Sequence, residues 1–92
     1  MKALIPNTLR KHRKRLRLRQ IDVDQILGFK KLRFKQISIW EKGLGFPNLE
    51  NVLKLSLLYK TKPEELYSEL FKNISQGLQK KMKQRKKNGA KK

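Results

Sequence analysis

The sequence contains no cysteine and only one histidine, and these two absences exclude whole classes of chemical site. Without cysteine there is no disulfide framework and no thiolate ligand for a metal ion. The single His12 has no cluster of other metal-binding or nucleophilic residues around it, which leaves little material for a zinc site or an activated nucleophile. We therefore expect no metal, no cofactor and no enzymatic activity.

Long apolar runs are also lacking. No stretch approaches the roughly 18–20 apolar residues that a membrane span needs. The basic N-terminal residues are not followed by the apolar stretch of a secretory signal. We therefore expect a cytoplasmic protein with no membrane partner. The 92 residues show neither an internal repeat nor a Gly/Ser linker, so one domain is expected.

Acidic residues are scarce, whereas basic residues are abundant. The chain holds 25 Lys and Arg against 7 Asp and Glu, a formal net charge of +18. Residues 80–92 contribute eight of the basic residues and no acidic one, and residues 1–79 still carry a net charge of +10. A field of this sign attracts polyanions, nucleic acid first and an anionic membrane surface second.

Apolar spacing and turn residues predict three helices in the first half of the chain. These are residues 8–17, residues 21–27, and a third helix that begins near Arg33 or Phe34 and ends at Lys42–Gly43. Thr8 is expected to cap the first helix, and Gly28 to end the second in a left-handed conformation. Ile37, Trp40 and Glu41 are spaced to form one inward stripe on the third.

Two further helices and a tail are expected in the second half. Asn48 is a suitable cap for a helix over residues 49–59, in which seven of eleven residues are apolar or Tyr, so this helix should lie centrally. Pro63 suits the first turn of a last helix, whose apolar side comprises Leu66, Tyr67, Leu70 and Phe71. We expect a folded domain over residues 1–72 and a basic tail, disordered or a frayed helix, over residues 73–92.

Several motifs fall in a familiar order along these helices. Over roughly residues 5–71 the chain resembles the phage-repressor/Cro-type (XRE-like) helix-turn-helix family. The motifs are Leu18-x-Gln20, Leu27-Gly28, Ile37-Ser38-x-Trp40-Glu41-x-Gly43, Pro47-x-Leu49-Glu50 and Pro63-Glu64-Glu65-Leu66-Tyr67. The resemblance implies an all-α, five-helix helix-turn-helix domain whose third helix enters the major groove of DNA, about 12 Å wide.

By this resemblance, the outward side of the third helix faces base edges. The residues at those positions are Phe34, Lys35, Ser38 and Ile39. Lys35 can donate to guanine O6 and N7, Ser38 can donate or accept, and Ile39 offers an apolar contact to a thymine methyl group. The plainer alternatives are that Lys35 and Ser38 are solvated surface and that Phe34 covers the core or a loop.

Other positions are expected to contact phosphates or to hold the scaffold. The expected phosphate contacts are Gln20, Arg33, Lys42 and the backbone around Leu44. Gln20 stands at the start of the second helix, where a side-chain amide and a helix N-terminus both suit a phosphate. The resemblance also implies a partly buried ion pair between Arg13 and Glu41, which would tie the first helix to the third.

The chain departs from the family pattern at three places. About three extra residues, Lys30-Lys31-Leu32, lengthen the turn between the second and third helices. Asp24 replaces the small residue that is usual where these helices approach each other. Arg17 stands where Gly is common, and a positive φ there would cost on the order of 1–2 kcal/mol.

The sequence therefore favours a sequence-specific DNA-binding transcriptional regulator, a repressor, associated with the nucleoid. Two alternatives stay open: a basic RNA-associated protein, and an antitoxin that represses its own operon and masks a toxin partner through the last helix or the tail. Two oligomeric states stay open: a homodimer with Leu66, Leu70 and Phe71 as its small apolar interface, and a monomer whose basic tail compensates for a small footprint on DNA.

Overall fold

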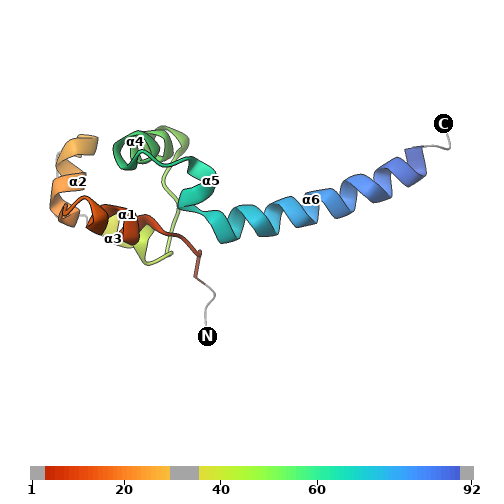
Figure 1. Cartoon of the computed structure of the whole chain (residues 1–92), viewed down its shortest axis with the longest axis horizontal. Helices are drawn as coiled ribbons and strands as arrows, with labels where there is room; N and C mark the ends of the chain where they lie inside the picture. The colour runs from red at the N-terminus through yellow and green to blue at the C-terminus, as the bar shows by residue number, and fades with distance from the viewer. Residues whose placement is uncertain (1–3, 30–35, 90–92) are drawn as a thin grey trace.

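The computed structural model describes residues 4–29 and 36–89, with side chains as far as Arg85. Within these ranges there is no strand, and the six helices are α1 (Leu9–Arg15), α2 (Gln20–Leu27), α3 (Gln36–Glu41), α4 (Leu49–Tyr59), α5 (Pro63–Leu66) and α6 (Ser68–Gly89). The all-α prediction is confirmed, whereas the predicted number of five helices is wrong. Helices α1 to α5 form a compact body, from which α6 extends as a rod (Figure 1).

The core of the body draws on every helix from α1 to α5. Its buried side chains are Leu9, Val23, Leu27, Ile37, Trp40, Leu55, Tyr59, Leu66 and Tyr67. Val23, Tyr59 and Leu66 are completely inaccessible to solvent. Full burial of a side chain such as Val or Leu stabilises the fold by about 1.5–3 kcal/mol, so these residues fix how the helices cross.

The start of α1 is fixed by contacts with α3 and α5. The Asn7 side chain accepts a hydrogen bond from the Leu9 amide at 3.1 Å and donates to the Trp40 carbonyl at 3.1 Å. Thr8 was predicted to cap this helix, but its hydroxyl donates to the carbonyl of Glu65 at 3.0 Å instead. Thr8 therefore occupies the predicted N-cap position but makes no side-chain capping bond, because a partner distant in sequence takes its hydroxyl.

The turns on either side of α2 follow the sequence pattern. Gly28 ends α2 with a φ of 91°, as predicted, and Arg17 has a φ of 60° in the preceding turn. Ile37 and Trp40 of α3 are 2% and 5% exposed, which confirms the inward stripe. The predicted start of α3 at residue 33 or 34 lies outside the described residues.

Helix α4 has the predicted bounds and the predicted cap, but it is not central. The Asn48 side chain accepts a hydrogen bond from the Asn51 amide at 2.9 Å. Only Leu55 and Tyr59 of this helix are buried, and the exposed leucines are Leu49, Leu53 and Leu57. The expectation of a central helix is wrong because the elements that pack on α4, α2 and α5 foremost, leave its side with Leu49, Leu53 and Leu57 exposed.

The predicted last helix is interrupted at Tyr67. This residue has φ −127° and ψ 50°, and it separates the short α5 from α6. Its ring is buried, with its centroid 6.0 Å from that of Phe46, so packing into the body takes Tyr67 out of helical geometry. Leu66 is buried in the same core, and it is therefore not available to the dimer interface predicted from the sequence.

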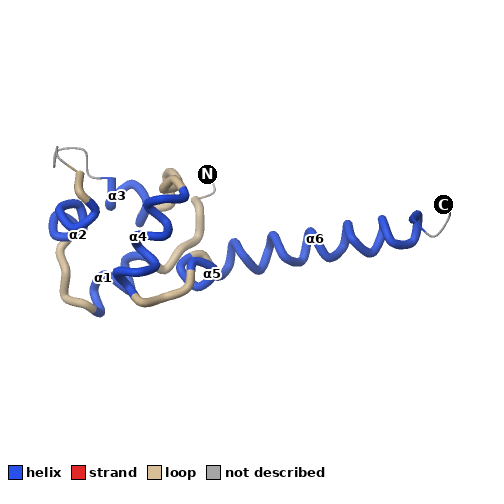
Figure 2. Tube along the Cα trace, turned by 90° about the horizontal axis from the view of Figure 1, so that it is seen from above, coloured by secondary structure: helices blue, strands red, loops and turns tan. Residues whose placement is uncertain are grey.

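The basic segment beyond Tyr67 is helical up to Gly89 (Figure 2). Of the two alternatives expected for the tail, disorder and a frayed helix, the structure has a helix, and this helix begins at Ser68, before the expected boundary at residue 72. Leu, Gln, Lys, Met and Arg make up most of α6 beyond Gly77, and all of them favour the helix. Propensity thus outweighs the lack of tertiary contacts that suggested disorder.

Candidate nucleic-acid interface

A buried polar network joins α1, α2 and α3. The guanidinium of Arg13 donates from Nε to Oε2 of Glu41 at 2.6 Å and from Nη2 to Oε1 at 3.1 Å. Gln20 Nε2 donates to the same Oε1 at 3.0 Å. The side chains of Arg13 and Glu41 are only 9% and 4% exposed, so this is the buried ion pair that the resemblance implied. The hydrogen bonds to Glu41 raise the pKa of Arg13 above its usual value.

The same guanidinium also holds the turn between α1 and α2. Its Nη1 donates to the carbonyl of Leu18 at 2.9 Å, so Arg13 spans from α1 to the turn and to the end of α3. A guanidinium has five donors in a rigid plane, and three of them are used here, two towards the Glu41 carboxylate and one towards the Leu18 carbonyl. The network therefore fixes the orientation of α3 relative to both preceding helices.

Beside this network lies a polar hollow of about 550 Å³. It is lined by Arg10, Arg13, Arg19, Gln20, Ser38, Glu41 and Lys42, which come from α1, α2, α3 and the adjoining turns. Arg10 and Lys42 are exposed at its edge. Glu41 is the one acidic residue in the lining and is paired with Arg13, so the hollow carries net positive charge and suits an anionic group.

Asp22 modifies the charge at the entrance of α2. Its carboxylate accepts hydrogen bonds from the Arg19 backbone amide at 2.7 Å and from Arg19 Nη2 at 2.9 Å. The hydrogen bond from the Arg19 side chain has the largest effect in lowering the pKa of Asp22 below its ordinary value, and the bond from the Arg19 backbone lowers it further. The carboxylate therefore caps the start of α2 and neutralises part of the positive charge of Arg19.

The predicted base-contacting residues have different positions. Phe34 and Lys35 lie outside the described residues, as does the predicted phosphate contact Arg33. Ser38 is half-buried and lines the hollow. Ile39 is half-buried and packs against the core, so part of its side chain is used in the scaffold.

Of the predicted phosphate contacts that the structure describes, two are exposed and one is bonded within the protein. Lys42 is exposed at the hollow, and Leu44 is 58% exposed in the turn after α3. Gln20 also lines the hollow, but its amide donates to Glu41 and is occupied within the protein. Arg10 and Arg19 were not predicted. Arg10 lies three residues before Arg13 and therefore on the same face of α1, a spacing that could have indicated its position.

Gly43 follows α3 and contacts the N-terminal segment of the chain. It has a φ of 76°, and its carbonyl accepts a hydrogen bond from the Ile5 amide at 3.0 Å. A Cβ atom at this position would collide with the Ile5 backbone. Gly43 is therefore required both for its backbone conformation and for the close approach of the N-terminal segment.

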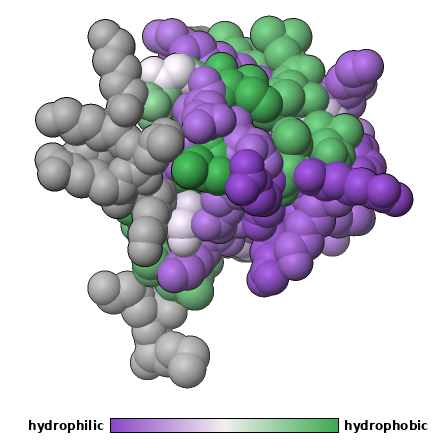
Figure 3. Space-filling view, turned by 90° about the vertical axis from the view of Figure 1, so that its left-hand side faces the viewer, coloured by the Kyte–Doolittle hydropathy of each residue, from purple (hydrophilic) through white to green (hydrophobic). Residues whose placement is uncertain are grey.

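The surface at this end of the molecule is mixed in character. Figure 3 views the end opposite to the tip of α6 and shows hydrophilic residues over much of the face, with apolar residues gathered towards its upper right. Ile26 of α2 and Leu57 of α4 are among the large apolar side chains that are exposed, at 55% and 78%. Hydrophilic and apolar residues thus share this end of the body.

No family model, no curated protein and no solved structure matches this chain. Among the described residues, no three His, Asp or Glu side chains come together as a metal site would require. In the same part of the chain, no helix has both the length and the apolar character that crossing a bilayer requires.

Proposed function

We propose that this protein binds duplex DNA through α2 and α3 and reads its sequence with α3, as a transcriptional repressor. The observation that carries the proposal is the buried network of Arg13, Glu41 and Gln20. A helix that reads base edges must be held at a fixed angle to the body, and this network holds α3 by its last residue. The proposal makes α2, α3 and the turn between them the helix-turn-helix unit.

The charges of the hollow support the same function. Arg10, Arg19 and Lys42 stand around the end of the network, where cations would meet the phosphates that flank a groove. Phosphate contacts position a protein on the duplex, and base contacts specify the sequence. In this proposal Ser38 and Lys35 supply the base contacts, and the protein acts in the cytoplasm on the nucleoid as a binding protein rather than an enzyme.

Selection of bound duplexes from a random DNA pool tests the proposal. The full chain is expected to enrich one sequence motif, and the selected duplex should bind at least about 10³-fold more tightly than random duplex at the same ionic strength. A random RNA of equal length serves as the competitor. The absence of any enriched motif, together with equal affinity for the RNA, would overturn the proposal in favour of a general RNA-associated protein.

A further inference from the structure

Helix α6 carries an apolar stripe that nothing in the described structure covers. Phe71, Ile74, Leu78 and Met82 follow one another at spacings of three and four residues, so they lie along one side of the helix. They are 54%, 52%, 55% and 66% exposed on a helix that extends well beyond the body (Figures 1 and 2). Four large exposed apolar side chains in a row indicate a binding surface.

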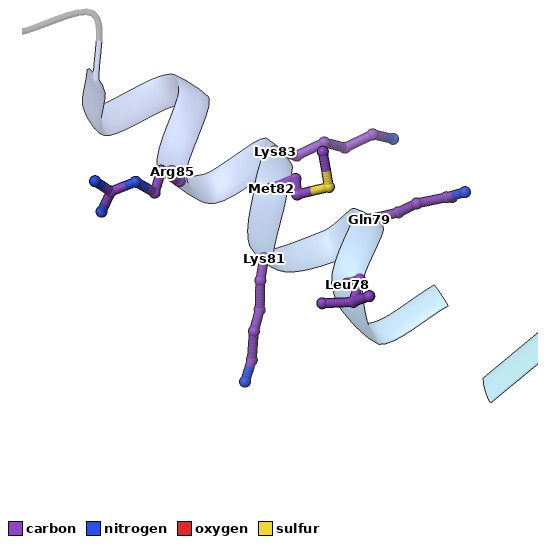
Figure 4. Close-up of a pocket in the computed structure, with 6 residues that line it drawn as sticks. All are labelled: Leu78, Gln79, Lys81, Met82, Lys83 and Arg85. Carbon is purple, nitrogen blue, oxygen red and sulfur yellow. The ribbon is translucent and has the colours of Figure 1, made fainter. Parts of the chain in front are cut away.

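The rest of α6 is strongly basic. Its sequence holds seven Lys and Arg residues and a single acidic residue, Glu69. Figure 4 shows Leu78 and Met82 on the helix, with the long side chains of Lys81 and Lys83 extending in different directions beside them. This part of the surface comes from one helix alone, so it is a ridge that a flat partner can contact along its length.

Three occupants of this surface can be compared by charge and by length. A second copy of α6 would bring two strongly positive helices together, and the stripe from residue 71 to 82 falls short of the three to four heptads typical of a coiled coil. Duplex DNA would attract the lysines and arginines but would leave the apolar stripe in water. An anionic lipid surface satisfies both features, because acyl chains accept the stripe and headgroups accept the cations.

We propose that α6 binds the surface of an anionic phospholipid bilayer and lies in its plane. Phe71, Ile74, Leu78 and Met82 enter the boundary between headgroups and acyl chains. The flanking lysines and arginines extend their aliphatic parts along the same boundary and place their charges among the headgroups. This proposal departs from the sequence-based expectation of no membrane partner, which rested on the lack of a membrane-spanning run. The absence of a spanning helix among the described residues does not bear on this mode of binding, since a helix that lies along the surface needs only one apolar side.

Vesicle co-sedimentation of the full chain tests this proposal. Vesicles of phosphatidylcholine with about 30% phosphatidylglycerol should bind the protein at least tenfold more tightly than phosphatidylcholine alone. The double variant Leu78→Gln, Met82→Gln keeps every charge and should bind the anionic vesicles at least tenfold more weakly. The matched control is Leu49→Gln with Leu57→Gln on α4, which removes two apolar side chains that are even more exposed and should leave vesicle binding unchanged.

The same variants keep this proposal separate from the one for DNA. Leu78→Gln, Met82→Gln should leave both the helical content and the affinity for a selected duplex unchanged, whereas Lys80→Gln, Lys83→Gln should weaken binding to anionic vesicles and to DNA. Vesicle binding that survives loss of the stripe would overturn the proposal. It would also be overturned by self-association at micromolar concentration that disappears in the stripe variant, which would show that the stripe binds a second copy.

Discussion

The carboxylate of Glu41 accepts three hydrogen bonds, two from Arg13 and one from Gln20. Glu41→Ala removes all three and leaves a guanidinium that is only 9% exposed without its counter-charge. Stranding one partner of a buried ion pair costs roughly 3–5 kcal/mol, against about 0–1 kcal/mol for an exposed pair. Arg13 keeps its bond to the Leu18 carbonyl, so we expect the lower part of that range, about 3 kcal/mol of unfolding free energy.

Urea and thermal unfolding, followed by the fluorescence of Trp40, measure this loss. Trp40 is 5% exposed in the core next to the network, so its signal reports the body and not α6. For a small domain, 3 kcal/mol corresponds to a fall in Tm of roughly 12–24 °C. The control is Glu69→Ala on exposed α6, which should change stability by about 0.5 kcal/mol or less.

The double variant Arg13→Met, Glu41→Leu separates the cost of a stranded charge from the cost of poorer packing. Replacing both members of a buried pair by apolar residues is often neutral or stabilising, so most of the stability should return. If the Glu41→Ala and Glu69→Ala variants unfold at the same Tm, the network does not hold α3, and the reasoning about the scaffold is refuted.

Three further predictions concern other parts of the molecule. Gly43→Ala should destabilise the body by more than Gly28→Ala. Both glycines have a positive φ, but only at Gly43 would a Cβ atom collide with the Ile5 backbone. Equal losses of unfolding free energy in urea would contradict this. Asp24→Asn should raise Tm at pH 7, because burial raises the pKa of Asp24 and stability contributed by its neutral form is lost as pH rises through that pKa. This gain should shrink towards pH 4, and a gain that does not depend on pH would contradict the assignment. Deleting residues 80–92 should reduce the salt dependence of DNA binding by about 0.9 in log–log slope for each phosphate that the tail neutralises, and an unchanged slope would show that the tail neutralises none.

Much of the body could be predicted from local sequence signals. Asn48 marks the start of α4, and Gly28 marks the end of α2. Both signals can be read from the sequence because a side-chain cap and a left-handed residue act within one turn of the chain. The ion pair of Arg13 and Glu41 came from the resemblance rather than from spacing alone, since the two residues are 28 positions apart.

The parts that could not be predicted depend on contacts distant in sequence. Thr8 looks like a cap until the carbonyl of Glu65 lies beside it, and Tyr67 looks helical until its ring packs against Phe46. At the candidate site, the sequence suggests that the Gln20 side chain is available to a phosphate, but its amide donates a hydrogen bond to the Glu41 carboxylate. In each case a tertiary partner outweighs the local preference of the residue.

The claim that α3 reads the DNA sequence is tested most directly by the ratio of affinities for a selected duplex and for random duplex. Lys35→Ala with Ser38→Ala should lower this ratio, since each base contact contributes about 1–3 kcal/mol of discrimination. Deletion of residues 80–92 should weaken binding to both duplexes by similar factors and leave the ratio unchanged. A ratio that collapses on deletion of the tail and survives the double substitution on α3 would contradict the account.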